Sequence, residues 1–370
     1  MPFSAEISPL PHLERQEVLA TAISCKVLLE RHVIDDYIDG IPPIGRVIDF
    51  NKEKIEAILT LTTSYSDSAT ENPISAGQVT LYNMSSDPMI KLGRAEYSGK
   101  ESAVAVILEE ECHVLQPMEG MPTFAMQDPF HFSNIDGWQI IGGVQIYERE
   151  AERPGNLGYR TVFFRYKDSV KELVNNEGQL VEPFVSSPDT MKGVRLAQLP
   201  NGKIAMFTRP QGGEFDLGKI CYRELNSLDD FTSETMSQPE LTLDLFKEGE
   251  WGGPNEVHVL SNGKLGVLSH IARFAPKDPT DPNSPIVKHY YASTFCFDPA
   301  TRQASHMKII ATADSFPNIE PKKDDLGGII YSGGIRRLDY GSAMLYCGVQ
   351  DRESAEVFLQ EDPFLEYERE

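Results

Sequence analysis

Tight turns that recur at a similar spacing constrain the fold of this chain more than any other feature. Two of them share the pattern Leu-x-Asn-Gly-Lys-apolar, and their glycines, Gly202 and Gly263, are 61 residues apart. An Asp-Gly turn at Gly137 lies 65 residues before the first, and a turn at Gly341 lies 78 residues after the second. Segments rich in Val, Ile, Phe and Tyr flank these turns, which is typical of β-hairpins. The sequence therefore predicts a repeated hairpin architecture.

A further turn at Ser98-Gly99 precedes Gly137 by 38 residues, which is short of a full repeat. The spacing exceeds the roughly 40–50 residues of a β-propeller blade, so each blade would carry loop insertions. We expect an all-β propeller over residues 76–370. A β-sandwich is the rival fold, but it holds fewer hairpins than this chain supplies. Residues 1–75 are expected to form a partly helical N-terminal extension that packs on or closes the ring, with helices near residues 13–29 and 51–58.

Composition excludes several classes of function. The 56 acidic and 34 basic residues give a formal charge of -22, which repels nucleic acid and anionic membrane surfaces. No run approaches the roughly 18 apolar residues of a membrane span, and the first residues lack the pattern of a signal peptide. The five cysteines show no CxxC spacing, so neither a disulfide framework nor a zinc site is predicted. We expect a cytoplasmic protein with no metal, nucleic-acid or membrane partner; the oligomeric state stays open.

Polar residues that follow apolar strands are the first candidates for a site. The innermost strand of each propeller blade and its adjoining loop border a central funnel. Arg209 follows "IAMFT", His270 follows "LGVLS", and Asp351 follows "MLYCGVQ". These residues are far apart in the sequence, but a ring of blades would bring them to one mouth. A solvated position on the rim is the alternative for an arginine that ends a strand.

Asp128 in "MQDPFHF" is the candidate acid. An Asp-Pro pair is often a turn in which the carboxylate caps the backbone, and Asp298-Pro299 is expected to be such a turn. Asp128 differs because it begins the first complete repeat and precedes an apolar segment. Burial beside apolar side chains raises the pKa of a carboxyl group, which suits a general acid.

A cationic, hydroxyl-lined pocket is expected inside this anionic protein, and such a pocket recognises phosphate. Asn255 and Glu256 of "EWGGPNEVHVL" follow paired glycines that let the backbone approach a ligand, although a simple β-bulge explains them equally well. Walker, HExxH and GxSxG motifs are absent from the sequence, so the corresponding enzyme classes lose their usual signatures. The residues expected to form the phosphate pocket are Arg165, Arg209, His270, Tyr290 and Tyr291.

An ordered set of motifs over residues 79–364 resembles a known family. They are "TLYNMSSDP", "LGRAE", "MQDPF", "MKGVRL", "FTRPQGG", "EWGGPNE", "LSNGKLGVLSHIA", "HYYAS", "YSGGIRRLD" and "LYCGVQD". Together they resemble a family of five-bladed β-propellers long catalogued as a domain of unknown function. That family is now grouped with dual-activity mannosyltransferase–phosphorylases and is similar to the β-mannoside phosphorylases of glycoside hydrolase family 130.

The resemblance implies an inverting reaction on β-1,2-linked mannosides. Mannose would pass to phosphate, giving α-mannose 1-phosphate, or be transferred from mannose 1-phosphate or GDP-mannose, with no further cofactor. Phosphate is already nucleophilic, so the enzyme needs cations to hold it and one carboxyl group as the acid, whereas hydrolysis needs a second carboxylate. The resemblance implies that Asp128 is that acid and that its proton reaches the glycosidic oxygen through a sugar hydroxyl.

The resemblance also assigns residues to subsites. Arg165, Arg209, His270 and one of Tyr290 and Tyr291 match the phosphate site. This chain departs from the family pattern at Gly193, where Asp is usual, and at Ser98-Gly99-Lys100, where the family carries an arginine that Lys100 would replace. Because of these departures, the resemblance does not specify which acceptor and which mannose donor this chain uses. The positions that match the mannose subsite are Asn83, Arg94, Lys192 and Asp351.

Two other functions fit the same scaffold. A β-mannoside hydrolase would need a second carboxylate, for which Glu256 is the candidate, and it would form no mannose 1-phosphate. A non-catalytic propeller that binds glycans or proteins would keep its function in Asp128→Asn.

Overall fold

The computed structural model describes part of the chain, with its longest continuous stretch over residues 157–277. The predicted helices near 13–29 and 51–58 lie outside the described residues, except for Leu29 and Ile58, which belong to short strands. Among the described residues no helix has both the length and the apolar character required to cross a membrane. The described residues are 29–30, 58–63, 91–96, 103–111, 114–117, 121–122, 124–148, 157–277, 281, 283–316, 321–351 and 353–369.

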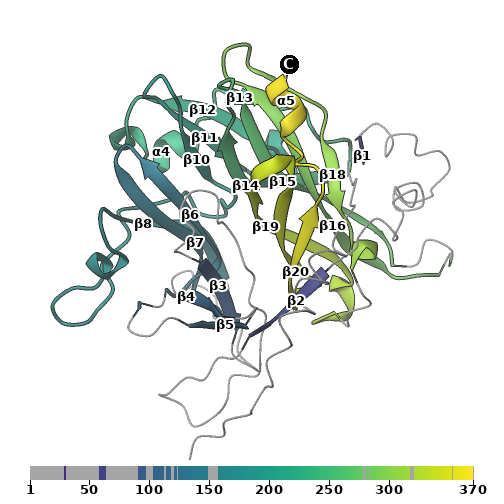
Figure 1. Ribbon diagram of the computed structural model, residues 1–370, viewed down its shortest axis with the longest axis horizontal. Helices are drawn as coiled ribbons and strands as arrows, with labels where there is room; N and C mark the ends of the chain where they lie inside the picture. Colours follow the sequence, from purple (N-terminus) through teal and green to yellow (C-terminus); the bar gives the residue numbers. More distant parts are fainter. Residues whose placement is uncertain are drawn as a thin grey trace, which may run out of the picture.

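The described residues are nearly all β, which confirms the all-β prediction, and their strands form successive antiparallel groups (Figure 1). The first groups are β3 (Lys91–Glu96), β4 (Ala103–Glu111) and β5 (Val114–Pro117), then β6 (Gln127–Ile135), β7 (Trp138–Glu148), β8 (Leu157–Tyr166) and β9 (Val185–Ser186). The next is β10 (Arg195–Gln198), β11 (Ile204–Thr208), β12 (Cys221–Leu225) and β13 (Leu241–Thr242).

The C-terminal half continues the same pattern. Its first group is β14 (Glu250–Val259), β15 (Leu265–Pro276), β16 (Ile286–Asp298), β17 (Gln303–Ala304) and β18 (Lys308–Ala311), with β1 (Leu29–Glu30) paired to β18. The last is β19 (Gly328–Arg337), β20 (Ala343–Val349), β21 (Glu353–Leu359) and β2 (Ile58–Thr63). Helices are short: α4 (Ser233–Met236), α5 (Leu365–Arg369) and 3-10 turns at Val170–Leu173, Gly213–Phe215, Leu228–Asp230, Ala313–Ser315, Asp324–Leu326 and Asp339–Gly341.

The recurring turns each connect the first two strands of a group. Gly137 lies between β6 and β7, Gly202 between β10 and β11, Gly263 between β14 and β15, and Gly341 between β19 and β20. All four glycines have φ between 78° and 86°, a left-handed conformation that glycine adopts without a steric penalty. Ser98-Gly99 lies outside the described residues, but it connects β3 to its antiparallel partner β4. The hairpins predicted at the four described turns are therefore confirmed.

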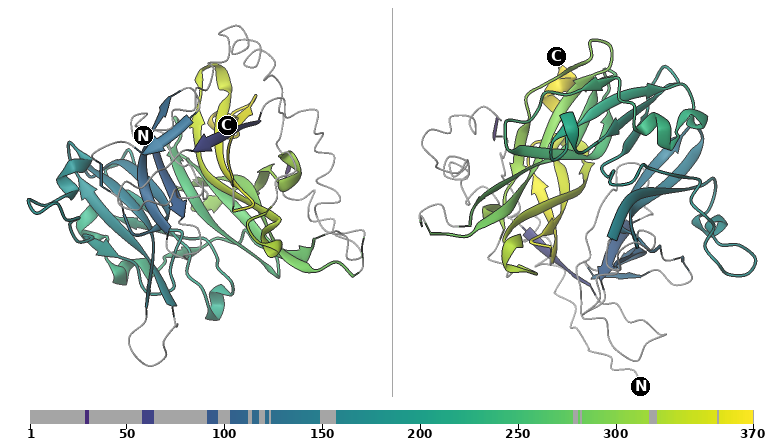
Figure 2. Two further views of the ribbon diagram at one scale, coloured as in Figure 1. Left: turned by 90° about the horizontal axis from the view of Figure 1, so that it is seen from below. Right: turned by 180° about the vertical axis from the view of Figure 1, so that it is seen from behind.

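The first strands of successive groups contact one another in chain order. β3 contacts β6, β6 contacts β10, β10 contacts β14, and β14 contacts β19. Figures 1 and 2 show the groups following one another around the molecule in the same order. Strand β2 comes from the residues predicted as an extension; it pairs antiparallel with β21 and parallel with β5, so it connects the last group to the first.

The hydrophobic core lies between successive sheets. Phe163 of β8 and Leu196 of β10 belong to one buried cluster, and Phe207 of β11 packs in another with Val267 of β15. A third cluster combines Leu268 with residues of β19 to β21. Because the sheets are covered on both faces, β15 is buried continuously over its first eight residues and its sequence lacks a strict alternation.

The C-terminal helix α5 is attached to the Asn262-Gly263 turn and to β19. Arg337 Nε contacts Asp362 Oδ2 at 2.6 Å, and its Nη2 contacts Glu368 Oε2 at 2.7 Å. Asn262 Nδ2 donates to the Tyr367 carbonyl at 2.7 Å. These bonds fix the end of the chain against the end of the sheet that carries the turns.

Candidate active site

The first strand of each group contributes one polar residue to a connected set of side chains. The members are linked by hydrogen bonds or by the effect of their charges on one another's pKa. Three of these strands carry a β-bulge at or beside the contributing residue, and bulges often re-aim side chains next to active sites. The five residues are Arg94 on β3, Asp128 on β6, Arg195 on β10, Asn255 on β14 and Tyr331 on β19.

Asp128 and Arg94 form an ion pair between neighbouring strand groups. Arg94 Nη1 donates to Asp128 Oδ1 at 2.8 Å. Asp128 lies in the bulge between Gln127 and Phe130 and has a φ of 47°, a left-handed conformation that is uncommon outside glycine. Burial opposes the charge of Arg94, but Asp128 and Asp351 outweigh it and raise the pKa of Arg94. The carboxylate of Asp351, which follows β20, therefore belongs to the same neighbourhood.

Arg195 and Tyr331 were missed at the sequence level and connect the two sides of the site. Arg195 lies over the Phe130 ring at 3.9 Å and its Nε donates to the Asn255 carbonyl. It also makes a side-chain hydrogen bond to Tyr331. Burial, with a further contribution from Asp128, raises the pKa of Tyr331 above its usual range, so this hydroxyl keeps its proton. The sequence signal that could have identified Arg195 and Tyr331 is a polar residue on the first strand of each repeat.

His270 is buried inside β15, which continues to Pro276; the prediction that the strand ends at this histidine is wrong. Its Nδ1 is 2.7 Å from Asn255 Oδ1, and its ring stacks on Tyr290 at 5.2 Å with an interplanar angle of 7°. Burial, and then the charges of Arg209, Lys192 and Arg195, lower the pKa of His270 well below its usual value. Its imidazole is therefore neutral near pH 7.

Arg209 is buried and enclosed by glycines. A Cβ on Gly218 would be 2.5 Å from Arg209 Nε, one on Gly253 would be 2.8 Å from its Cδ, and one on Gly193 would be 3.1 Å from its Cβ. Its Nη2 donates to the Leu217 carbonyl at 3.3 Å. Burial lowers the pKa of Arg209, although an arginine stays charged at any ordinary pH. Gly193, the departure from the family pattern, thus makes room for this side chain.

Lys192 lies within the influence of both sides of the site. Burial and then Arg209 lower its pKa, whereas Asp128 raises it. Its Nζ is 5.6 Å from the centre of the Tyr159 ring. Lys192 therefore places the carboxylate of Asp128 and the guanidinium of Arg209 in one electrostatic neighbourhood.

Arg165 does not join this set, contrary to the prediction. Its guanidinium stacks on Trp138 at 4.5 Å and on Phe184 at 4.9 Å. Tyr159, which neighbours Lys192, is six residues away on the same strand, and at 3.3 Å per residue this separates them by roughly 20 Å. Arg165 therefore lies toward the end of the strand that leads away from the site.

Tyr291 was also assigned incorrectly to the pocket. Successive residues of a strand point to opposite faces, so Tyr290 and Tyr291 diverge. Tyr290 stacks on His270, whereas Tyr291 is buried in the core cluster with Phe295 and stacks on His289. Only Tyr290 of this pair neighbours the cationic residues.

Glu256 faces away from the ligand-side residues as well. Its Oε2 accepts the Ile335 N–H at 2.7 Å and is 3.3 Å from His258 Nε2. Asn255, in the bulge, points to His270 instead. The prediction that Glu256 binds substrate, and with it the candidate water-activating carboxylate of a hydrolase, is not supported by this geometry.

Some predicted site residues lie outside the described part of the chain, and others are brought together by the structure. The first set is Asn83 and Ser98-Gly99-Lys100. No group of three or more His, Cys, Asp or Glu side chains with metal-site geometry occurs in the described part of the chain. The predicted site residues that the structure brings together are Arg94, Asp128, Lys192, Arg209, Asn255, His270, Tyr290 and Asp351.

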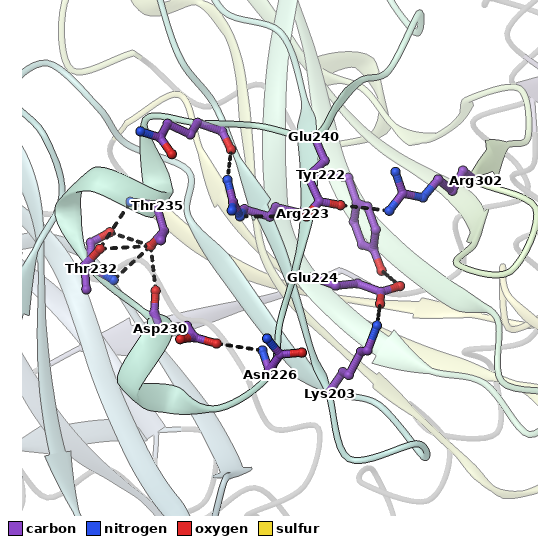
Figure 3. A network of polar contacts seen from close by, with 11 residues as sticks. Lys203, Tyr222, Arg223, Glu224, Asn226, Asp230, Thr232, Thr235, Glu240 and Arg302 are labelled. Atoms are coloured by element: carbon purple, nitrogen blue, oxygen red, sulfur yellow. Dashed lines mark hydrogen bonds and ion pairs between the residues drawn. The ribbon is translucent and has the colours of Figure 1, made fainter.

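A second polar cluster, around β12, differs from this site because its charges are paired (Figure 3). Lys203 and Tyr222 both contact Glu224, at 2.8 Å and 3.2 Å, and Arg302 contacts Glu240 at 2.8 Å. Lys203, Glu240 and Arg302 are exposed, Glu224 is half-buried and Tyr222 is buried; these groups satisfy one another, as in an ordinary surface network. A hollow on the surface lies here, away from the set around Asp128.

The site thus combines carboxylates with an excess of buried cations. Asp128 and Asp351 belong to one set of residues with Arg94, Lys192, Arg195 and Arg209, in a protein that is strongly anionic overall. Buried arginines that are held by backbone carbonyls are suited to an anionic group of a ligand. A carboxylate beside them is suited to proton transfer.

The fold and this site define a class: an all-β protein of successive antiparallel sheets whose first strands surround a cationic centre with an aspartate. The chain belongs to the family described as "Protein of unknown function (DUF1861)", whose model matches residues 79–366. A search of curated proteins found no match.

Solved structures share this fold. MPT-4, a mannose phosphorylase from Leishmania mexicana in complex with phosphate ion, is 25% identical with a TM-score of 0.68, over 84% of this chain and 90% of that chain. MPT-1, a GDP-Man-dependent mannosyltransferase from Leishmania mexicana, is 25% identical with a TM-score of 0.67 over the same shares. A hypothetical protein from Leishmania major, 23% identical with a TM-score of 0.62 over 82% of this chain and 90% of that chain, supports the fold alone.

Proposed function

We propose that this protein is an enzyme of mannosyl transfer, a glycosyltransferase or glycoside phosphorylase acting on β-1,2-mannooligosaccharides. Mannose would pass between the glycan and phosphate, or from GDP-mannose to an acceptor. The observation that carries the proposal is that Asp128 and Arg209 both act on the pKa of Lys192. A proton-transfer group and buried cations therefore lie in the same site. The likeness to a mannose phosphorylase and to a mannosyltransferase supports the same chemistry.

The proposed reaction inverts the anomeric carbon. An oxygen of hydrogenphosphate forms a bond to C1 of a β-mannoside from the α face, while the bond from C1 to the glycosidic oxygen breaks. The leaving oxygen takes a proton from Asp128 through a sugar hydroxyl, and the proton of hydrogenphosphate restores that of Asp128. The products are α-mannose 1-phosphate and the shortened glycan. A single carboxyl group suffices because phosphate needs no activation by a general base.

The proposed subsites follow the arrangement of charge. Arg94, Lys192 and Asp351 hold the mannose near Asp128, and Arg209, His270 and Tyr290 hold the phosphate. Arg195 lies between the two groups through its contacts with Tyr331 and with the Asn255 backbone. We further propose that residues 76–370 form a five-bladed propeller and that residues 1–75 close it.

The test is a set of paired incubations of the full-length protein. β-1,2-mannobiose is supplied with and without phosphate, and mannose is supplied with mannose 1-phosphate or GDP-mannose. The proposal expects mannose 1-phosphate only when phosphate is present, or transfer to mannose from one of the donors. Phosphate-independent release of free mannose would indicate a hydrolase. Glycan binding without turnover under every condition would indicate a non-catalytic propeller.

A further inference from the structure

The two ring nitrogens of His270 have different surroundings. Nδ1 is 2.7 Å from the side-chain oxygen of Asn255. The amide nitrogen of Asn255 donates to the Ser332 carbonyl at 2.6 Å, which turns the amide oxygen toward the ring. An amide oxygen only accepts hydrogen bonds, so Nδ1 must carry a proton. In a neutral imidazole the other nitrogen, Nε2, then presents a lone pair.

Nε2 of His270 is buried and has no hydrogen-bond partner within the described part of the chain. Arg209 Nε is also buried without a hydrogen-bond partner there. The two side chains are neighbours, because Arg209 Cδ and His270 Cε1 lie 2.8 Å and 3.3 Å from the point where a Cβ on Gly253 would stand. A buried acceptor, His270 Nε2, and a buried donor, Arg209 Nε, cost free energy while they are unpaired. A ligand that forms hydrogen bonds with both would be stabilised there.

Within the part of the chain that the structure describes, the charges that act on His270 are all positive. Arg209 follows β11, Lys192 precedes β10, and Arg195 lies on β10. The neutral groups Asn255 of β14 and Tyr290 of β16 cover the ring edge and one ring face. Burial, and then these cations, keep the imidazole neutral, and the cations also attract an anion. The anion at this position therefore meets a lone pair on one side and cations on the other.

We propose that His270 Nε2 accepts a hydrogen bond from an O–H group of the bound anion, so that the site selects hydrogenphosphate over sulfate. This inference rests on the proposed use of phosphate. Inorganic phosphate carries at least one O–H group near neutral pH, whereas sulfate carries none and would set an oxygen against the lone pair. The ring cannot rotate to avoid this contact without breaking its bond to Asn255 and its stacking on Tyr290.

Calorimetric titration of the full-length protein with inorganic phosphate and with sulfate at pH 7.5 tests the selection. We expect sulfate to bind at least about tenfold more weakly than phosphate, the order of magnitude for one unpaired buried group. In His270→Gln the side-chain amide can present either its NH₂ or its oxygen, so the ratio should fall below about threefold, since little unpaired cost remains.

His289→Gln is the matched control. His289 lies on β16, and its Nε2 is 3.2 Å from the Pro276 carbonyl, so the same substitution there should leave the ratio of the two affinities unchanged. Nitrogen-15 NMR of the wild-type histidines provides a readout that needs no variant. We expect His270 in the Nδ1–H form at pH 7.5.

The outcomes separate this inference from the proposed function. Equal affinities for phosphate and sulfate, or an Nε2–H or doubly protonated His270, would overturn the selection even if phosphorolysis were observed. A protein that binds neither anion and forms no mannose 1-phosphate would contradict the proposed function, and the inference with it.

Discussion

Asp128 accepts a hydrogen bond of 2.8 Å from Arg94 across the contact between strands β6 and β3. The two residues come from different strand groups and are brought together by the fold. The arginine orients the carboxylate, and the bulge at Asp128 turns it out of the regular strand. A mannose hydroxyl that reaches Asp128 must therefore fit beside this ion pair, which restricts the pose of the sugar.

Asp128→Asn should lower turnover by about 10²- to 10⁴-fold, as expected for loss of a general acid, while the mannoside still binds. Steady-state rates and calorimetry of the glycan measure the two effects separately. Asp298→Asn is the control, because Asp298 also precedes a proline but caps the Ala300 N–H in a turn. Wild-type turnover in Asp128→Asn would exclude the residue as the acid.

Gly193→Ala should raise the phosphate concentration needed for half-maximal rate by about three- to tenfold, since a shift of Arg209 weakens a charged hydrogen bond by about 1 kcal/mol. The added Cβ would be 3.1 Å from Arg209 Cβ. Gly178→Ala is closely matched, because Gly178 has φ 78° against 75° for Gly193 but no atom within 4 Å of the added Cβ.

Both alanine variants should lose about 1 kcal/mol of unfolding free energy from the left-handed φ alone. Urea unfolding measures this shared loss. An equal phosphate requirement in the two variants would show that Gly193 does not position Arg209.

The loss of stability at acid pH should be smaller in His270→Gln than in the wild type. The folded pKa of His270 is depressed, so the unfolded chain binds a proton that the folded protein excludes. The contribution of the neutral ring is present above the ordinary histidine pKa of about 6.5 and falls as pH drops below it. Between pH 7.5 and 5.5 this amounts to about 1.4 kcal/mol. Parallel pH dependence of urea unfolding in both proteins would contradict a neutral His270.

Arg337→Gln should destabilise the protein by about 2 kcal/mol, because it leaves the buried Asp362 carboxylate without its partner. Arg337 and the Ser261 N–H also hold the pKa of Glu368 down to about 2. The contribution of Glu368 is present above the usual carboxyl range and is lost as pH falls toward 2. The difference in unfolding free energy between Arg337→Gln and the wild type should therefore become smaller at acid pH.

Thermal or urea unfolding at neutral pH and near pH 3 checks this. Arg302→Gln removes an exposed ion pair with Glu240 and should change stability by less than about 1 kcal/mol. If both arginine variants lost the same stability, the attachment of α5 would not depend on the buried pair.

The hairpins were predictable because a tight turn is a local property. The glycine of an Asn-Gly or Asp-Gly pair adopts a left-handed φ at little steric cost, so the turns at Gly137, Gly202 and Gly263 could be located from a few residues. Their spacing also placed Asp128 at the start of a first strand, where the structure has it.

The side-chain directions were not predictable in the same way. Tyr290 and Tyr291 are adjacent, and only the register of β16 decides which one meets His270. A bulge between Pro254 and Glu256 turns Asn255, and not Glu256, toward the same ring. Such a bulge depends on the register in which β14 pairs with β15, which the residues around Asn255 do not reveal by themselves.

The choice of arginines shows the same limit. Arg165 and Arg195 both lie on apolar strands, but they occupy opposite ends of their sheets relative to the site. Arg165 finds Trp138 and Phe184, whereas Arg195 meets Tyr331 and the Asn255 backbone. Their positions along β8 and β10, and the contact of β10 with β14, distinguish them.

Proton NMR of the full-length protein with β-1,2-mannobiose, recorded as inorganic phosphate is titrated in, shows whether the acid and the anion-binding cations act together in one centre. In the wild type, α-mannose 1-phosphate should accumulate in proportion to the phosphate consumed, and this product should be lost in Asp128→Asn and in Arg209→Ala. For Arg209→Ala, added phosphate should restore part of the rate. Mannose 1-phosphate formed equally well by both variants, or mannose released at a rate independent of phosphate, would contradict a single centre that combines the acid with the anion-binding cations.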